Sequence, residues 1–104
     1  MNIVNSNFQK EVMEETDRVV VLKFGSTTCA PCKRLEQIIN KFNSDKVKVC
    51  HVNIDDEIEL AQTFNISSVP STFIYKGGQF QCFLGGLFNE KKLIECLSSV
   101  GVVL

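Results

Sequence analysis

The feature that most constrains this chain is a pair of cysteines, Cys29 and Cys32, placed where a strand-like run ends and a helical pattern begins. Residues 19–24 are almost all β-branched or large and apolar, which is typical of a strand buried on both faces. After the pair, apolar residues recur at helical spacing: Leu35, Ile38, Ile39 and Phe42. A cysteine at a helix start lies near unpaired backbone N–H groups, which favour its thiolate. The sequence therefore predicts strand, reactive pair and helix in succession.

The spacing of the two cysteines alone leaves three interpretations open. They are a reversible dithiol, two structural thiols, or half of a metal or iron–sulfur site. A metal site needs about four ligands, so two chains would have to share their pairs, and no other sequence feature supports this. Pro31, between the cysteines, suits the first turn of a helix, where a missing N–H costs no hydrogen bond.

Length and charge narrow the classes of function. The chain has 104 residues, enough for one domain over residues 1–104 with one core. Its net charge of −1 gives no basic surface for nucleic acid or an anionic membrane. No apolar run approaches the ~20 residues that span a bilayer. Residues 1–17 lack a basic stretch followed by an apolar one, so we expect no signal peptide and a cytoplasmic, reducing location. We also expect a monomer.

The remaining cysteines do not form a second motif. Five cysteines is an odd count, and Cys50, Cys82 and Cys96 stand alone in apolar or mixed runs. A disulfide scaffold has a different pattern. We therefore predict that these three are small buried hydrophobic residues.

The periodicity along the chain predicts alternating helices and strands followed by a hairpin. The predicted order is a helix over 8–15, a strand over 19–24, the helix after the cysteines, a strand over 47–54, a short helix ending near 64, strands over 72–75 and 80–84, and a helix capped by Asn89. This order predicts an α/β fold with a central mixed sheet of four to five strands and helices on both faces.

Two polar residues interrupt the apolar strands. Lys23 shares a strand face with Val19 and Val21, close to the cysteines. It is either a functional cation or a side chain that extends its ammonium to water. His51 shares a face with Val47 and is most simply a half-buried core residue.

Several separate motifs, in order, together resemble the thioredoxin family over essentially the whole chain. They are Phe24, Cys29-Ala30-Pro31-Cys32-Lys33, Asn53-Ile54-Asp55, Val69-Pro70-Ser71-Thr72, Lys76-Gly77-Gly78 and Gly86. The resemblance implies a thioredoxin fold and a thiol–disulfide oxidoreductase. It also implies no bound cofactor beyond the reversible Cys29–Cys32 disulfide, and two kinds of partner, a thioredoxin reductase and proteins that carry disulfides.

The resemblance also implies roles for individual residues. Cys29 would attack the substrate disulfide, and the more buried Cys32 would resolve the mixed disulfide. Pro70 would be the family's cis-proline. The backbone of Val69 would pair with the substrate's extended chain, and Gly86 would complete the groove.

The sequence departs from the family at several positions. Thr28 replaces the usual tryptophan before the first cysteine, Ala30 replaces a glycine, and Gln37 replaces a proline that kinks the helix. Lys23 replaces the family's buried acid, and His51 replaces its lysine partner.

These replacements have chemical consequences. Lys23, if neutral, or His51 would take the proton from Cys32. A charged Lys23 is expected to hold the pKa of Cys29 below that of ordinary thioredoxins and to make the couple more oxidising. Thr28 and Ala30 alter the contact surface, which leaves open a dedicated partner of one reductase or one substrate. A separate alternative is a binding or scaffold protein with the thioredoxin fold whose motif is vestigial.

Overall fold

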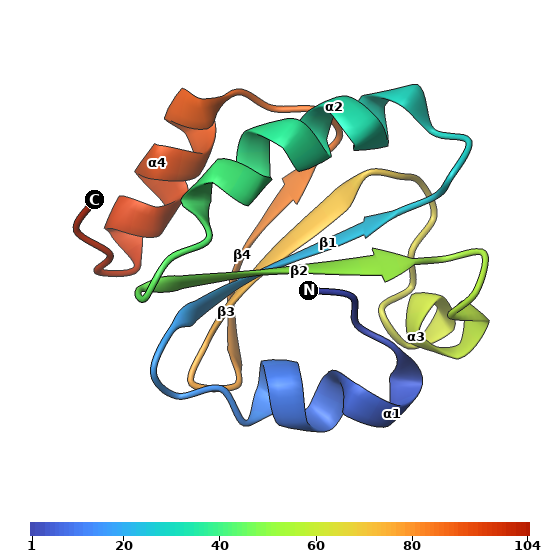
Figure 1. Ribbon diagram of the computed structural model, residues 1–104, viewed down its shortest axis with the longest axis horizontal. Helices are drawn as coiled ribbons and strands as arrows, with labels where there is room; N and C mark the ends of the chain where they lie inside the picture. Colours follow the sequence, from blue (N-terminus) through green and yellow to red (C-terminus); the bar gives the residue numbers. More distant parts are fainter.

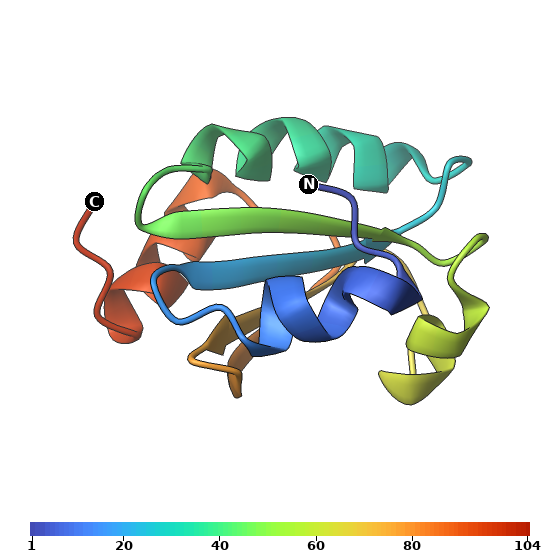
Figure 2. The same ribbon diagram turned by 60° about the horizontal axis from the view of Figure 1, so that its bottom comes forward.

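The computed structural model describes all 104 residues and has a four-stranded mixed sheet with helices on both faces (Figures 1 and 2). The elements are α1 (Asn5–Phe8), the π-helical η1 (Gln9–Met13), β1 (Val19–Gly25), α2 (Ala30–Ile39), the 3-10 turn η2 (Asn40–Phe42), β2 (Val47–Asn53), α3 (Ile58–Thr63), β3 (Ser71–Lys76), β4 (Gln79–Gly85) and α4 (Glu90–Ser99). The predicted fold class and order of elements are confirmed.

The strands lie in the order β2-β1-β3-β4. β1 is parallel to β2, and the hairpin of β3 and β4 is joined to β1 through β3, which is antiparallel to it. The N-terminal residues add one short pairing at the free edge of β2, where Ile3 N–H donates to the His51 carbonyl at 2.7 Å and His51 N–H donates to the Met1 carbonyl at 2.9 Å. The sheet therefore has four strands, and a single bridge from Asn2 occupies a fifth position.

The two faces of the sheet carry separate apolar clusters. Helices α2 and α4 cover one face, and α1 and α3 cover the other (Figure 2). Alternate residues of β1 divide between them, since Val21 packs toward α2 and α4 while Leu22 packs toward α1 and α3. All seven residues of β1 are buried, as the sequence predicts.

The first helix is displaced from its predicted position. It begins at Asn5 rather than Phe8 and ends at Met13 rather than Glu15. Val4 precedes the helix and donates its N–H to the Asn7 side-chain oxygen at 2.8 Å. Asn7 therefore stabilises the helix start from within the first turn.

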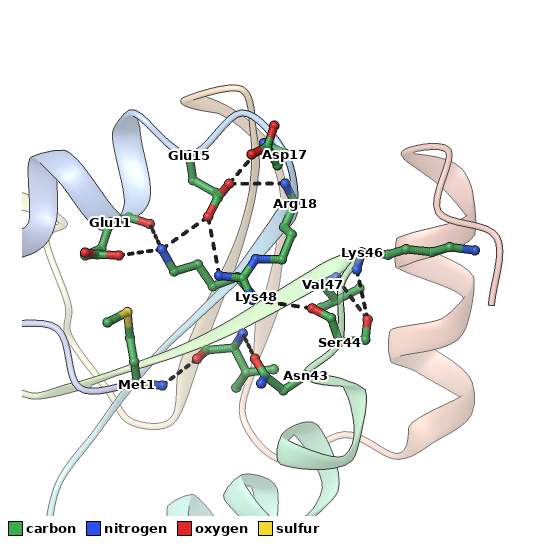
Figure 3. Close-up of polar contacts among 11 residues, drawn as sticks. Met1, Glu11, Glu15, Asp17, Arg18, Asn43, Ser44, Lys46, Val47 and Lys48 are labelled. Carbon is green, nitrogen blue, oxygen red and sulfur yellow. Dashed lines mark hydrogen bonds and ion pairs between the residues drawn. The ribbon is translucent and has the colours of Figure 1, made fainter.

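A buried ion pair ties this first helical segment to β2 (Figure 3). The Lys48 Nζ atom lies 2.7 Å from a carboxylate oxygen of Glu11 and 3.2 Å from one of Glu15. Burial alone would lower the pKa of Lys48, but the two carboxylates raise it above its ordinary value. The positive charge of Lys48 is therefore compensated inside the fold by the carboxylates of Glu11 and Glu15.

The cysteines outside the motif differ from expectation. Cys50 is buried and free, as predicted. Cys82 on β4 is only partly buried, and it forms a disulfide with Cys96 on α4. The prediction of three isolated thiols was therefore wrong for this pair. The two residues meet because α4 packs on the face of β4, a contact that spacing along the chain does not reveal.

Candidate active site

The two motif cysteines lie at the start of α2, immediately beyond the carboxyl end of β1 (Figure 1). They form a disulfide whose Cα atoms are 5.2 Å apart. Cys29 is the N-cap residue, and its sulfur accepts a hydrogen bond from the Cys32 N–H at 3.2 Å. Pro31 lies in the first turn, as predicted.

The two sulfurs have unequal access to solvent. Cys29 is partly exposed, whereas Cys32 is 1% exposed. A substrate disulfide can therefore reach Cys29, whose sulfur is also the one nearest the unpaired N–H groups of the helix start. The expected contrast between an accessible and a shielded cysteine is present in the structure.

A second loop lies at the same end of the sheet. The Val69–Pro70 peptide bond is cis, as the resemblance implied, and Pro70 leads directly into β3. Phe24 at the end of β1 pairs with Ser71, so the cysteine loop and the proline loop leave adjacent strands.

The predicted groove residues surround these loops. Gly86 donates its N–H to the Pro70 carbonyl at 2.9 Å, with a positive φ of 70°. Thr28, Ala30 and Gly86 are exposed, and Val69 is partly exposed. These four residues are small, and no bulky apolar side chain precedes Cys29.

Lys23 lies beneath this surface and does not extend to bulk water. Its residue is 4% exposed, and its Nζ atom is 3.5 Å from a carboxylate oxygen of Glu36 on α2. A Cβ atom on Gly25 would lie 3.2 Å from the Cys32 sulfur and 3.3 Å from Cε of Lys23. Lys23 and Cys32 therefore flank the same glycine, which leaves both of them room.

Glu36 is the site residue that the sequence reasoning missed. It follows Cys32 by four residues, so the two side chains lie on one face of α2. That spacing, together with a lysine in the preceding strand, was the available signal. A cavity of about 470 Å³ opens beside the pair, and its lining includes Lys23, Glu36, His51, Lys33 and Ser26.

The neighbours of Lys23 form a polar row across three strands. Lys23 pairs with His51 of β2 on one side and with Thr72 of β3 on the other. Nδ1 of His51 and the hydroxyl of Thr72 are buried without a hydrogen-bond partner, while Nε2 of His51 lies 2.8 Å from the Asn40 side-chain oxygen. This row replaces apolar contacts directly below the helix that carries Cys32.

Burial sets the protonation of the row. Burial first, and then the positive charge of Lys23, lower the pKa of His51 to about 4, so the imidazole is neutral at pH 7. Burial also lowers the pKa of Lys23, although the Glu36 carboxylate opposes that change. The row of Lys23, His51 and Thr72 therefore contains one cation, Lys23, and the Glu36 carboxylate favours its charged form.

These features define a class of protein. An accessible cysteine at a helix start, a shielded partner, and an adjoining cis-proline loop at one end of a mixed sheet are the parts of a dithiol–disulfide redox protein. A family model described as Thioredoxin matches residues 1–99. The chain belongs to the thioredoxin family, and it is a thiol–disulfide oxidoreductase that uses Cys29 and Cys32.

Known relatives agree with this membership. A thioredoxin of Rickettsia bellii is 32% identical over 101 residues, covering 94% of this chain and 95% of the relative. Thioredoxin 1 of a Nostoc species is 31% identical over 98 residues, covering 91% of each chain. The structure of a mutant thioredoxin from Halobacterium salinarum superposes with a TM-score of 0.86 at 22% identity, covering 100% of this chain and 92% of its own, which supports the fold.

No helix is both long enough and apolar enough to cross a membrane. No group of three or more His, Cys, Asp and Glu side chains is placed to hold a metal ion.

Proposed function

We propose that this thioredoxin-family protein reduces disulfides in other proteins, passing on electrons that it receives from a thioredoxin reductase. The observation that carries the proposal is the unequal exposure of Cys29 and Cys32 at the start of α2. We also propose that it works as a monomer in a reducing compartment such as the cytoplasm. Membership of the family supports these statements.

The reaction proceeds by two exchanges. The Cys29 thiolate attacks one sulfur of the substrate disulfide and displaces the other as a thiolate, which forms a mixed disulfide. Cys32 loses its proton and attacks the Cys29 sulfur, which releases the second substrate thiolate and closes the Cys29–Cys32 bond. Two electrons pass from the protein to the substrate, and a reductase returns them.

The substrate lies, in this proposal, between the cysteine loop and the proline loop. The backbone of Val69 pairs with an extended segment of the substrate, while Thr28, Ala30 and Gly86 form the floor and sides of the groove. Their small or exposed side chains support this placement, because an extended chain needs close access to backbone groups.

The polar row below Cys32, formed by Lys23, His51 and Thr72, shifts the reduction potential of the Cys29–Cys32 couple in this proposal. We assign to Lys23 the stabilisation of the cysteine thiolates, because its Cε atom and the Cys32 sulfur both lie beside Gly25, within 3.3 Å of the position that a Cβ atom would take there. Glu36 holds that ammonium in position and favours its charged form. His51, with a pKa of about 4, holds a proton too weakly at pH 7 to serve as the main base.

Reduction of insulin disulfides by dithiothreitol tests the proposal. C29S should abolish catalysis, and C32S should accumulate a mixed disulfide visible as a covalent adduct. C50S is the matched control, since this buried free cysteine lies in the opposite apolar cluster, and it should retain catalysis. An inactive wild-type protein would overturn the proposal and favour a scaffold, while activity toward only one natural substrate would favour a dedicated partner.

A further inference from the structure

The second disulfide, between Cys82 and Cys96, belongs to no part of the catalytic machinery described above. Cys82 lies in the middle of β4 and pairs with Ile74, whereas Gly85 at the end of the strand pairs with Ser71 beside the proline loop. Three residues of strand span about 10 Å. The pair is therefore set back from the groove along the sheet.

The two cysteines differ in access, as the catalytic pair does. Cys96 is 9% exposed, and Cys82 on the edge strand is partly exposed. The remaining thiol, Cys50, is fully buried in the cluster on the opposite face of the sheet and has no route to either sulfur. Any internal exchange outside the motif thus involves Cys82 and Cys96 alone.

The segment enclosed by this pair carries part of the substrate groove. It runs from the end of β4 through Gly86 to Asn89, which caps α4 by accepting a hydrogen bond from the Lys92 N–H at 3.0 Å. Gly86 is also bonded to the Pro70 carbonyl. A bond between Cys82 and Cys96 fixes both ends of this segment to each other, whereas two thiols leave the segment without this covalent link.

The distance between the backbones of β4 and α4 decides whether Cys82 and Cys96 can form their bond. The Cα atoms are 7.3 Å apart. Disulfides usually span roughly 4.4–6.8 Å between Cα atoms. The pair therefore lies beyond this range, at a separation that two cysteines bridge only if the backbones move toward each other, so the bond depends on α4 packing closely on β4.

We propose that Cys82 and Cys96 are a second dithiol–disulfide couple, separate from Cys29 and Cys32, and that its oxidation tethers the segment that carries Gly86. A low-molecular-weight disulfide such as oxidised glutathione is the oxidant. The Cys82 thiolate attacks it and displaces one glutathione thiolate; the Cys96 thiolate then attacks the mixed disulfide and displaces the second. Two protein thiols become one disulfide, their protons pass to solvent, and the glutathione disulfide becomes two thiols.

The C29S/C32S variant isolates this couple from the catalytic one. It is equilibrated in glutathione buffers of graded ratio, quenched with acid, denatured, alkylated and weighed intact. We expect three alkylated thiols in reducing buffer and one in oxidising buffer, with peptide mapping that joins Cys82 to Cys96. Adding C50S as the matched control should lower these numbers to two and none.

Three results would overturn the proposal: three free thiols at every ratio, a stable glutathione adduct without ring closure, or a bond that includes Cys50. Because the variant lacks both catalytic cysteines, each of these results leaves the proposed reductase function untouched. Peptide mapping of the oxidised wild-type protein gives a second test that needs no substitution, and it should show both disulfides.

Hydrogen exchange tests the tether itself. In C29S/C32S, the amides of residues 85–88 should exchange more slowly in oxidising buffer than in reducing buffer. Adding C82S should remove this difference. Equal exchange in both buffers, with the disulfide formed, would contradict the tether.

Discussion

Two buried lysines in neighbouring strands show how one residue type serves two purposes. Lys48 of β2 faces η1 and contacts two carboxylates at 2.7 and 3.2 Å, whereas Lys23 of β1 faces α2 and has one carboxylate at 3.5 Å. The pKa of Lys48 is raised by its partners, while burial lowers that of Lys23. Lys48 is thus a fully compensated structural cation, and the charge of Lys23 remains available to the cysteines.

Breaking the Lys48 cluster should have the largest effect on stability. K48M leaves two carboxylates without their cation, and loss of one partner from a fully buried pair costs roughly 3–5 kcal/mol. We expect a smaller loss here, because Glu11 and Glu15 keep some contact with solvent. Urea unfolding measures the loss, and the reduction potential of the catalytic pair should not move. A shift in the potential without a loss of stability would reverse the roles of the two lysines.

The corresponding substitution in β1, K23M, should change the reduction potential of the catalytic pair more than it changes stability. K23M places an apolar side chain of similar length beside an apolar cluster, so stability should change little or rise. The Cys29–Cys32 potential should become more negative by about 30 mV, equivalent to about 1.4 kcal/mol of lost thiolate stabilisation. Equilibration with dithiothreitol buffers measures it. E90Q, which removes the exposed Lys41–Glu90 pair, is the matched control and should leave the potential unchanged.

Raising the pH should change the stability contributions of Lys48 and Lys23 in opposite directions. Lys48 has a raised folded-state pKa, so its contribution is complete below the ordinary lysine value of about 10.4 and is lost as pH rises through the raised value. Lys23 has a lowered pKa, so its burial destabilises the fold below that pKa, and this cost is relieved as pH rises toward about 10.4. The stability differences between wild type and each variant, measured by unfolding at several pH values, should therefore change in opposite directions.

Among these substitutions, H51Q should have the smallest effect on stability. Its folded pKa of about 4 lies below its ordinary value of 6.5, so folding disfavours the imidazolium. The wild type should lose stability from this group as pH falls from 6.5 to about 4, and H51Q should lose less. At neutral and slightly alkaline pH the two proteins should have equal potentials. A potential that differs between them in this range would show that His51 takes part in the redox step.

Local patterns predicted most of this fold, but contacts between distant segments escaped them. The near-continuous apolar run of residues 19–24 and the helical face after Cys32 predicted β1 and α2 correctly, because each pattern is contained within one element. The Cys82–Cys96 bond depends on how α4 lies on β4, and no period encodes that. The pairing of Glu36 with Lys23 likewise appears only once α2 lies over β1. The early start of the first helix depended on one side chain, Asn7, bonding back to Val4.

The reduction potential of the Cys29–Cys32 couple, compared between wild type and K23M, tests the central claim most directly. Alkylation followed by peptide mapping keeps this couple distinct from Cys82 and Cys96. The account predicts a wild-type value some tens of millivolts above the roughly −270 mV of thioredoxin, and a return toward that value in K23M. A wild-type value near roughly −270 mV that K23M leaves unchanged would contradict the claim that Lys23 retunes the pair.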